Sequence, residues 1–157
     1  MYFRNALCAS VLFVNVLIAA ENPFIGTWKM LPDKSTFVTG QELKEMTVVF
    51  TAEGDKIRRT ASGTYVNGEP LDEGGSQGGI LPWDGKPHIV HETGPNVVVS
   101  CTPVKDRSSE ATMKIDGKLV RRAVAKVSAN GQTLSESRDN YDSQGKKSKT
   151  VVIFEKQ

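Results

Sequence analysis

The sequence contains little of several residue types that carry chemistry or cross-links. It has two cysteines and two histidines in 157 residues, and aromatic residues make up 7% of the chain. Its 20 Lys and Arg nearly balance 18 Asp and Glu, which leaves a formal net charge of +2. Nucleic-acid binders usually carry a clustered basic surplus, and disordered chains have fewer apolar residues than the 38% found here. The composition therefore predicts one folded domain that does not bind nucleic acid.

The long apolar run of the sequence lies at its start. It extends from Ala6 to Ala20 behind a single charge, Arg4, and ends in small residues. This pattern is typical of a signal peptide, and the polar Asn15 within it argues against a permanent membrane anchor. We expect a secreted or periplasmic protein with no stable membrane insertion after cleavage. The expected domains are a signal peptide at residues 1–20 and a mature domain at residues 21–157.

Removal of the signal peptide also limits cysteine chemistry. Cys8 leaves with it, so Cys101 stays alone and the mature chain forms no internal disulfide. A mature chain of about 137 residues is long enough to be stabilised by an apolar core instead. A lone cysteine is usually a small buried side chain, and a reactive thiol or pairing between chains is the alternative.

Short β-type segments separated by Gly, Asn and Asp turns occupy the mature chain. Asp-Gly and Asn-Gly pairs predict tight hairpins, because both central positions of such turns take positive φ. A single helical turn is expected at residues 41–44. We predict an all-β fold, a single antiparallel up-and-down β-barrel of roughly eight to nine strands, because a meander must close to hide its edges. The expected strands cover residues 24–30, 46–52, 57–66, 88–91, 97–104, 110–115, 119–127, 133–141 and 150–155.

Alternation along the strands predicts which side chains face inward. Met46, Val48, Phe50 and Ala52 form a core face, as do Ala111, Met113 and Ile115. The apolar sides of two other segments carry Arg59 and Arg121 among small neighbours, whereas one side of 133–141 is polar and mostly small. Inward arginines beside a tyrosine predict a cavity that binds a carboxylate or another anion. In the alternative interpretation a β-bulge reverses the facing, or the arginines reach water.

A glycine-rich connection over residues 67–86 is long for a compact domain. It includes Leu81 and Trp83, and it predicts either a lid over the barrel mouth or a disordered segment anchored by Trp83. With this loop included, the predicted ligand-binding residues are Arg59, Tyr65, Arg121, Ser135, Ser137, Tyr141 and Trp83.

Catalytic and metal-binding motifs are scarce. The sequence has no His-Glu-x-x-His motif and no cysteine pair for zinc. His88 would lie across from Cys101 if the turn between them centres on Gly94-Pro95, and such a pair can bind a metal or activate the thiol. Because two ligands do not make a closed site, we predict a protein that is not an enzyme and that uses no cofactor or metal.

The segment Gly26-Thr27-Trp28 resembles the Gly-x-Trp signature of lipocalins and the wider calycin group. The stretch from Phe24 to Phe37, including Asp33-Lys34-Ser35, is similar to uncharacterised exported bacterial lipocalin-like proteins, as are the segments 83–87 and 152–157. The resemblance implies a structural role for Gly26 and Trp28, with Trp28 closing the bottom of the barrel against an arginine of a late strand. The candidates for this arginine are Arg138, Arg121 and Arg122.

Two functions agree with these features. In the first, which the resemblance also implies, an exported barrel binds a small hydrophobic or amphipathic molecule that can be anionic. In the second, the barrel is filled, and a secreted interaction module acts through its surface or the 67–86 loop. A cavity lined by small residues of the late strands favours the first function, and a packed interior with an exposed apolar patch favours the second.

Overall fold

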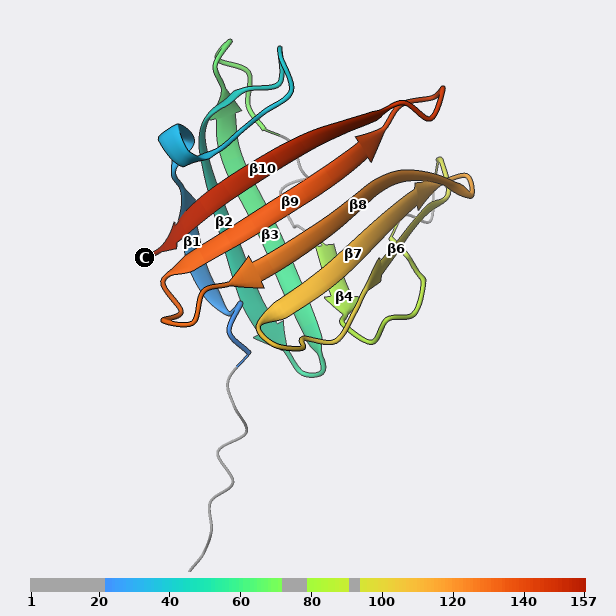
Figure 1. The fold of residues 1–157 in the computed structure, drawn as a ribbon. Coiled ribbons are helices and arrows are strands. Elements are labelled where there is room, and N and C mark those ends of the chain that lie inside the picture. The colour runs from blue at the N-terminus through green and yellow to red at the C-terminus, as the bar shows by residue number, and fades with distance from the viewer. Residues whose placement is uncertain (1–21, 72–78, 91–93) are drawn as a thin grey trace, which may run out of the picture.

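A computed structural model describes residues 22–71, 79–90 and 94–157, and its described part forms one curved antiparallel sheet (Figure 1). The sheet has ten strands in the order β4-β3-β2-β1-β10-β9-β8-β7-β6-β5 and wraps into a nearly closed barrel. The predicted all-β barrel is therefore confirmed. The strands are β1 (Gly26–Met30), β2 (Leu43–Glu53), β3 (Lys56–Tyr65), β4 (Gly79–Pro82), β5 (His88–Ile89), β6 (Val97–Cys101), β7 (Ser108–Ile115), β8 (Lys118–Val127), β9 (Thr133–Tyr141) and β10 (Lys147–Lys156).

Two details of the predicted elements differ from the structure. Strand β4 lies in the glycine-rich connection and pairs with β3, with Ile57 opposite Leu81. Its glycine content indicated a loop, so the sequence did not reveal it. The helical turn expected at residues 41–44 is wrong, because Leu43 begins β2 and packs into the core. A single turn of 3-10 helix, η1 (Pro32–Lys34), forms earlier in the chain.

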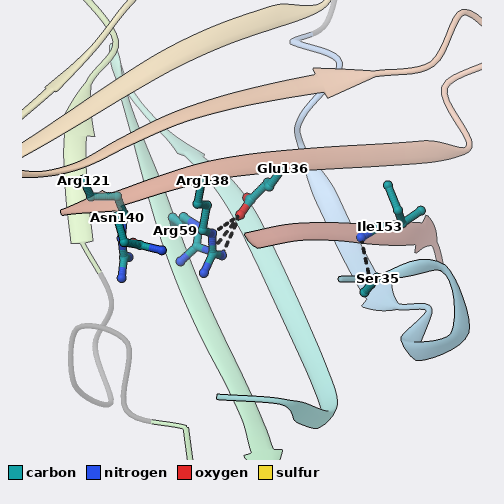
Figure 2. A network of polar contacts seen from close by, with 7 residues as sticks. All are labelled: Ser35, Arg59, Arg121, Glu136, Arg138, Asn140 and Ile153. Carbon is teal, nitrogen blue, oxygen red and sulfur yellow. Dashed lines mark hydrogen bonds and ion pairs between the residues drawn. The ribbon is translucent and has the colours of Figure 1, made fainter. Parts of the chain in front are cut away.

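The segment around η1 continues the pairing with β10 beyond the end of β1. Leu31 donates its N–H to the carbonyl of Ile153 at 2.8 Å, and Thr36 pairs with Val151 in both directions. Between them, the Ser35 hydroxyl accepts the N–H of Ile153 at 3.0 Å (Figure 2). The same hydroxyl donates to the carbonyl of Leu31 at 2.9 Å. Ser35 thus replaces a missing strand partner of β10, which gives the serine of the Lys-Ser pair a structural role.

The apolar core gathers where β1, β2 and the C-terminal half of β10 meet. Trp28 is fully buried, and its indole N–H donates to the carbonyl of Phe24 at 2.8 Å. The rings of Phe24, Phe50 and Trp83 meet edge to face, with centroids 5.0 to 6.0 Å apart. This aromatic cluster fixes the connection after β4 to the core, as the anchoring of Trp83 predicts.

The core face predicted for β2 is largely confirmed. Met46, Val48 and Phe50 are at most 3% exposed, but Ala52 is exposed near the end of the strand. Within the described residues, no helix has the length and apolar character that a membrane span requires. The expected signal peptide lies outside the described residues.

Candidate functional site

The inward face of β9 carries charge. Leu134, Glu136 and Arg138 are buried along the strand, whereas the residues between them are not. Because successive strand residues point to opposite sides, Ser135 and Ser137 lie on the outer face. The inward facing predicted for Ser135, Ser137 and Tyr141 is therefore wrong. The prediction relied on the small size and weak polarity of the two serines. The structure buries Glu136 and Arg138 in their place, because a carboxylate and a guanidinium can be buried together when they pair.

Glu136 joins two opposite parts of the wall. Its Oε2 atom accepts from Arg138 Nε at 3.1 Å and from Arg138 Nη2 at 2.6 Å. The same oxygen lies 3.6 Å from Nη2 of Arg59, which reaches it from β3 (Figure 2). Arg59 also lies over the ring of Phe50, 6.0 Å from its centroid. The inward facing predicted for Arg59 is confirmed, because its side chain meets a buried residue of β9.

Arg121 is the third arginine on this inward surface. It stands opposite Asn140 in the β8–β9 register, and its Nε donates to Asn140 Oδ1 at 2.9 Å. Asn140 follows Arg138 by two residues, so both side chains lie on the same face of β9. The prediction that Arg121 faces inward is confirmed. Leu119, two residues before Arg121, does not share this facing, because the β7–β8 register shifts after Met113, and Leu119 is 39% exposed.

Small side chains surround these charges. The ladder places Arg138 beside Ala123, Ala123 beside Ala111, and Ala111 beside Cys101, in one row across β9, β8, β7 and β6. Paired residues of neighbouring strands share a face, so the whole row points inward with Arg138. Ala111, Ala123 and Cys101 are nevertheless only half-buried. Other side chains therefore do not cover this part of the wall completely.

Cys101 is a weakly acidic thiol in this setting. Burial raises its pKa to about 11, although the nearby Arg59 guanidinium opposes the rise. His88 stands opposite Val99 and not Cys101, so the expected pairing with the thiol is wrong by two residues. Its Nε2 instead contacts Asp84 Oδ1 at 2.9 Å, and this contact lowers the pKa of Asp84. Within the described ranges, no group of three or more His, Cys, Asp or Glu side chains is placed to hold a metal ion.

Trp28 has a different cationic neighbour from the one that the resemblance implies. The ammonium of Lys156 lies 5.4 Å from the centre of the Trp28 ring. Gly26 makes room for it, because a Cβ at Gly26 would come within 3.0 Å of Lys156 Cε. Arg138 and Arg121 instead bond to Glu136 and Asn140. The third candidate, Arg122, points outward and pairs with Glu110 at 2.8 Å.

The remaining predicted site residues lie away from the charged cluster. Tyr65 packs against the apolar core at the end of β3, and Trp83 packs against it after β4. Trp83 also borders an open groove of about 500 Å³ beside the β2–β3 turn, which none of the inward arginines lines. Residues 72–78 of the 67–86 connection lie outside the described residues, and the lid prediction depends on them.

The structure adds three residues to the candidate site that the sequence analysis did not place there, which are Glu136, Arg138 and Asn140. A signal for them exists in the sequence. Leu134 is the strongest apolar residue of the segment, and the three residues follow it at every second position. Because a core-facing apolar residue fixes the facing of the rest of its strand, Leu134 indicates that all three face inward.

Solved structures with a similar fold are known. The Schistosoma mansoni fatty acid binding protein in complex with arachidonic acid matches with a TM-score of 0.59 and 17% identity, over 87% of this chain and 97% of that chain. The zebrafish ileal bile acid-binding protein complexed with cholic acid matches with a TM-score of 0.54 and 13% identity. The match covers 86% of this chain and 99% of that chain. The Echinococcus granulosus fatty-acid-binding protein 1 matches with a TM-score of 0.51 and 19% identity. The match covers 85% of this chain and 97% of that chain.

These likenesses define the class of fold. The chain has a calycin-like β-barrel fold, which it shares with these fatty-acid-binding proteins. No protein-family model matches the sequence, and no curated protein sequence matches it either.

Proposed function

We propose that the barrel binds a small amphipathic molecule in its interior, with an acidic head group near the inward arginines. The observation that carries the proposal is the partly unfilled wall around Arg138, where Ala111, Ala123 and Cys101 face inward but remain half-buried. Ligand pockets combine such apolar surface with a few convergent polar groups.

The charges of the cluster favour an acid over a neutral ligand. Arg59, Arg121 and Arg138 bring three guanidiniums to the described inward surface, and Glu136 brings one carboxylate. A guanidinium binds a carboxylate through two parallel hydrogen bonds, and the attraction is stronger away from bulk water. The similar barrels support this class of ligand, because arachidonic acid and cholic acid in their complexes are both amphipathic carboxylic acids.

A fluorescence titration with dansyl-labelled undecanoic acid tests the proposal. Arg121→Gln should weaken binding about tenfold, which corresponds to losing one charged contact of roughly 1.4 kcal/mol. Arg122→Gln is the matched control, because Arg122 is adjacent in β8 but exposed and paired with Glu110. Equal affinities of the two variants would place the probe outside the cluster, for example in the groove beside Trp83. A wild-type protein that binds no probe would favour a surface-acting interaction module.

We also propose export of the protein. The proposal is supported by the apolar run from Ala6 to Ala20 behind Arg4 and by its small closing residues. The intact mass of protein recovered from a periplasmic extract tests it. The mass of residues 21–157 is expected, and the mass of the full chain would contradict cleavage.

A further inference from the structure

Glu136 already occupies the position of an anion in the interior. One of its oxygens lies between guanidiniums that come from β3 and β9, which is the geometry expected for a bound carboxylate. Its side chain is 8% exposed, so the negative charge is held where water screens it little.

The two guanidiniums hold Glu136 unequally. Arg138 makes two hydrogen bonds to it, at 2.6 and 3.1 Å, and is 9% exposed. Arg59 approaches only to 3.6 Å, beyond normal hydrogen-bond length, and its side chain is 29% exposed. A group that enters the barrel therefore meets Arg59 more readily than Arg138, and the contact between Arg59 and Glu136 is the weaker one to replace.

We propose that Glu136 is a specificity-determining residue that competes with the ligand head group for Arg59. This inference rests on the proposed function, the binding of an amphipathic acid in the interior. A ligand carboxylate takes over the Arg59 contact, while Arg138 keeps Glu136 in place. Because the Glu136 charge repels a second anion nearby, it lowers the affinity for acids and leaves neutral ligands of the same shape unaffected.

The test compares dansyl-labelled undecanoic acid with its neutral primary amide. The measured quantity is acid selectivity, defined as the dissociation constant of the amide divided by that of the acid. Glu136→Gln keeps a side-chain oxygen for Arg138 but removes the charge, and should raise acid selectivity about tenfold. Glu110→Gln is its control, because Glu110 pairs with Arg122 on the outer face and should leave acid selectivity unchanged.

A second variant covers the case in which Glu136→Gln does not fold, since loss of one partner of a buried ion pair is destabilising. Arg59→Gln leaves the contacts between Glu136 and Arg138 intact and should lower acid selectivity about tenfold. Arg58→Gln is its control, because Arg58 is the neighbour of Arg59 in β3 and pairs with Glu53 at the surface.

The outcomes separate this inference from the function on which it rests. Wild-type protein that binds both probes, with acid selectivity unchanged or lowered in Glu136→Gln, would overturn the role of Glu136 alone. Unchanged acid selectivity in Arg59→Gln would do the same. Failure of the wild-type protein to bind either probe would overturn both proposals.

Discussion

The inward side chains of β2 and β8 line the same barrel but differ in how they fill it. Met46, Val48 and Phe50 are large and at most 3% exposed. Ala123 of β8 also points inward, but it is small and half-buried. The comparison shows that one part of the wall supplies the packed core, whereas the wall around Arg138 leaves space beside charged groups. Stability and binding are therefore assigned to different parts of one interior.

The largest expected effect comes from removing volume on the packed side. Leu134→Ala should lower the free energy of unfolding by about 2–5 kcal/mol, because Leu134 is fully buried and its loss leaves a cavity. Ala123→Val adds volume on the open side and should cost less than the roughly 1–3 kcal/mol usual for overpacking. Urea unfolding measures both. Equal losses would mean that the interior is filled throughout.

Close backbone packing gives the next effect. Gly63→Ala should destabilise the fold by about 1–3 kcal/mol, since an added Cβ would lie 2.3 Å from the carbonyl oxygen of Glu45, where the β2–β3 register shifts. Gly79→Ala in β4 is the control, because no atom of the described residues lies within 4 Å of its added Cβ. Thermal unfolding should separate the two variants, and a similar cost for both would contradict the close approach at Gly63.

A pH effect is expected at Cys101, on the open side. Burial raises its folded pKa to about 11 from the ordinary 9.0, so the folded state holds the proton more tightly. This contribution to stability is complete below pH 9.0 and is lost as the pH rises through about 11. The stability difference between wild type and Cys101→Ala, followed by urea unfolding across this range, should shrink. A constant difference would mean that the thiol ionises as readily as in the unfolded chain.

The smallest expected effect lies beside Trp28. Lys156→Gln should cost about 0.5–1 kcal/mol, because it removes the ammonium over the indole ring. Lys29→Gln, at an exposed position of β1 next to Trp28, should cost less. Chemical denaturation compares the two variants. A larger loss for Lys29→Gln would refute the assigned contact.

Much of the fold was predictable from the sequence. Turn signals such as Asp116-Gly117 are local, and both residues do take positive φ, at 48° and 79°. The site was harder to predict, because it depends on which strands meet. Arg59 and Arg121 were found from alternation, but Glu136 and Arg138 are buried because they pair with each other along β9 and because Arg59 reaches Glu136 from β3. Such pairing is a tertiary property that single-residue polarity does not reveal.

The position of a bound head group tests the central claim most directly. Carbon-13 NMR of dodecanoic acid labelled at its carboxyl carbon reports whether the bound carboxyl group is ionised as the pH is lowered. Binding near Arg59 and Arg121 should keep it ionised below the pH at which the free acid titrates, because the guanidiniums favour the carboxylate. A bound carboxyl group that titrates as the free acid does, in wild type and in Arg59→Gln alike, would contradict an acid site inside the barrel.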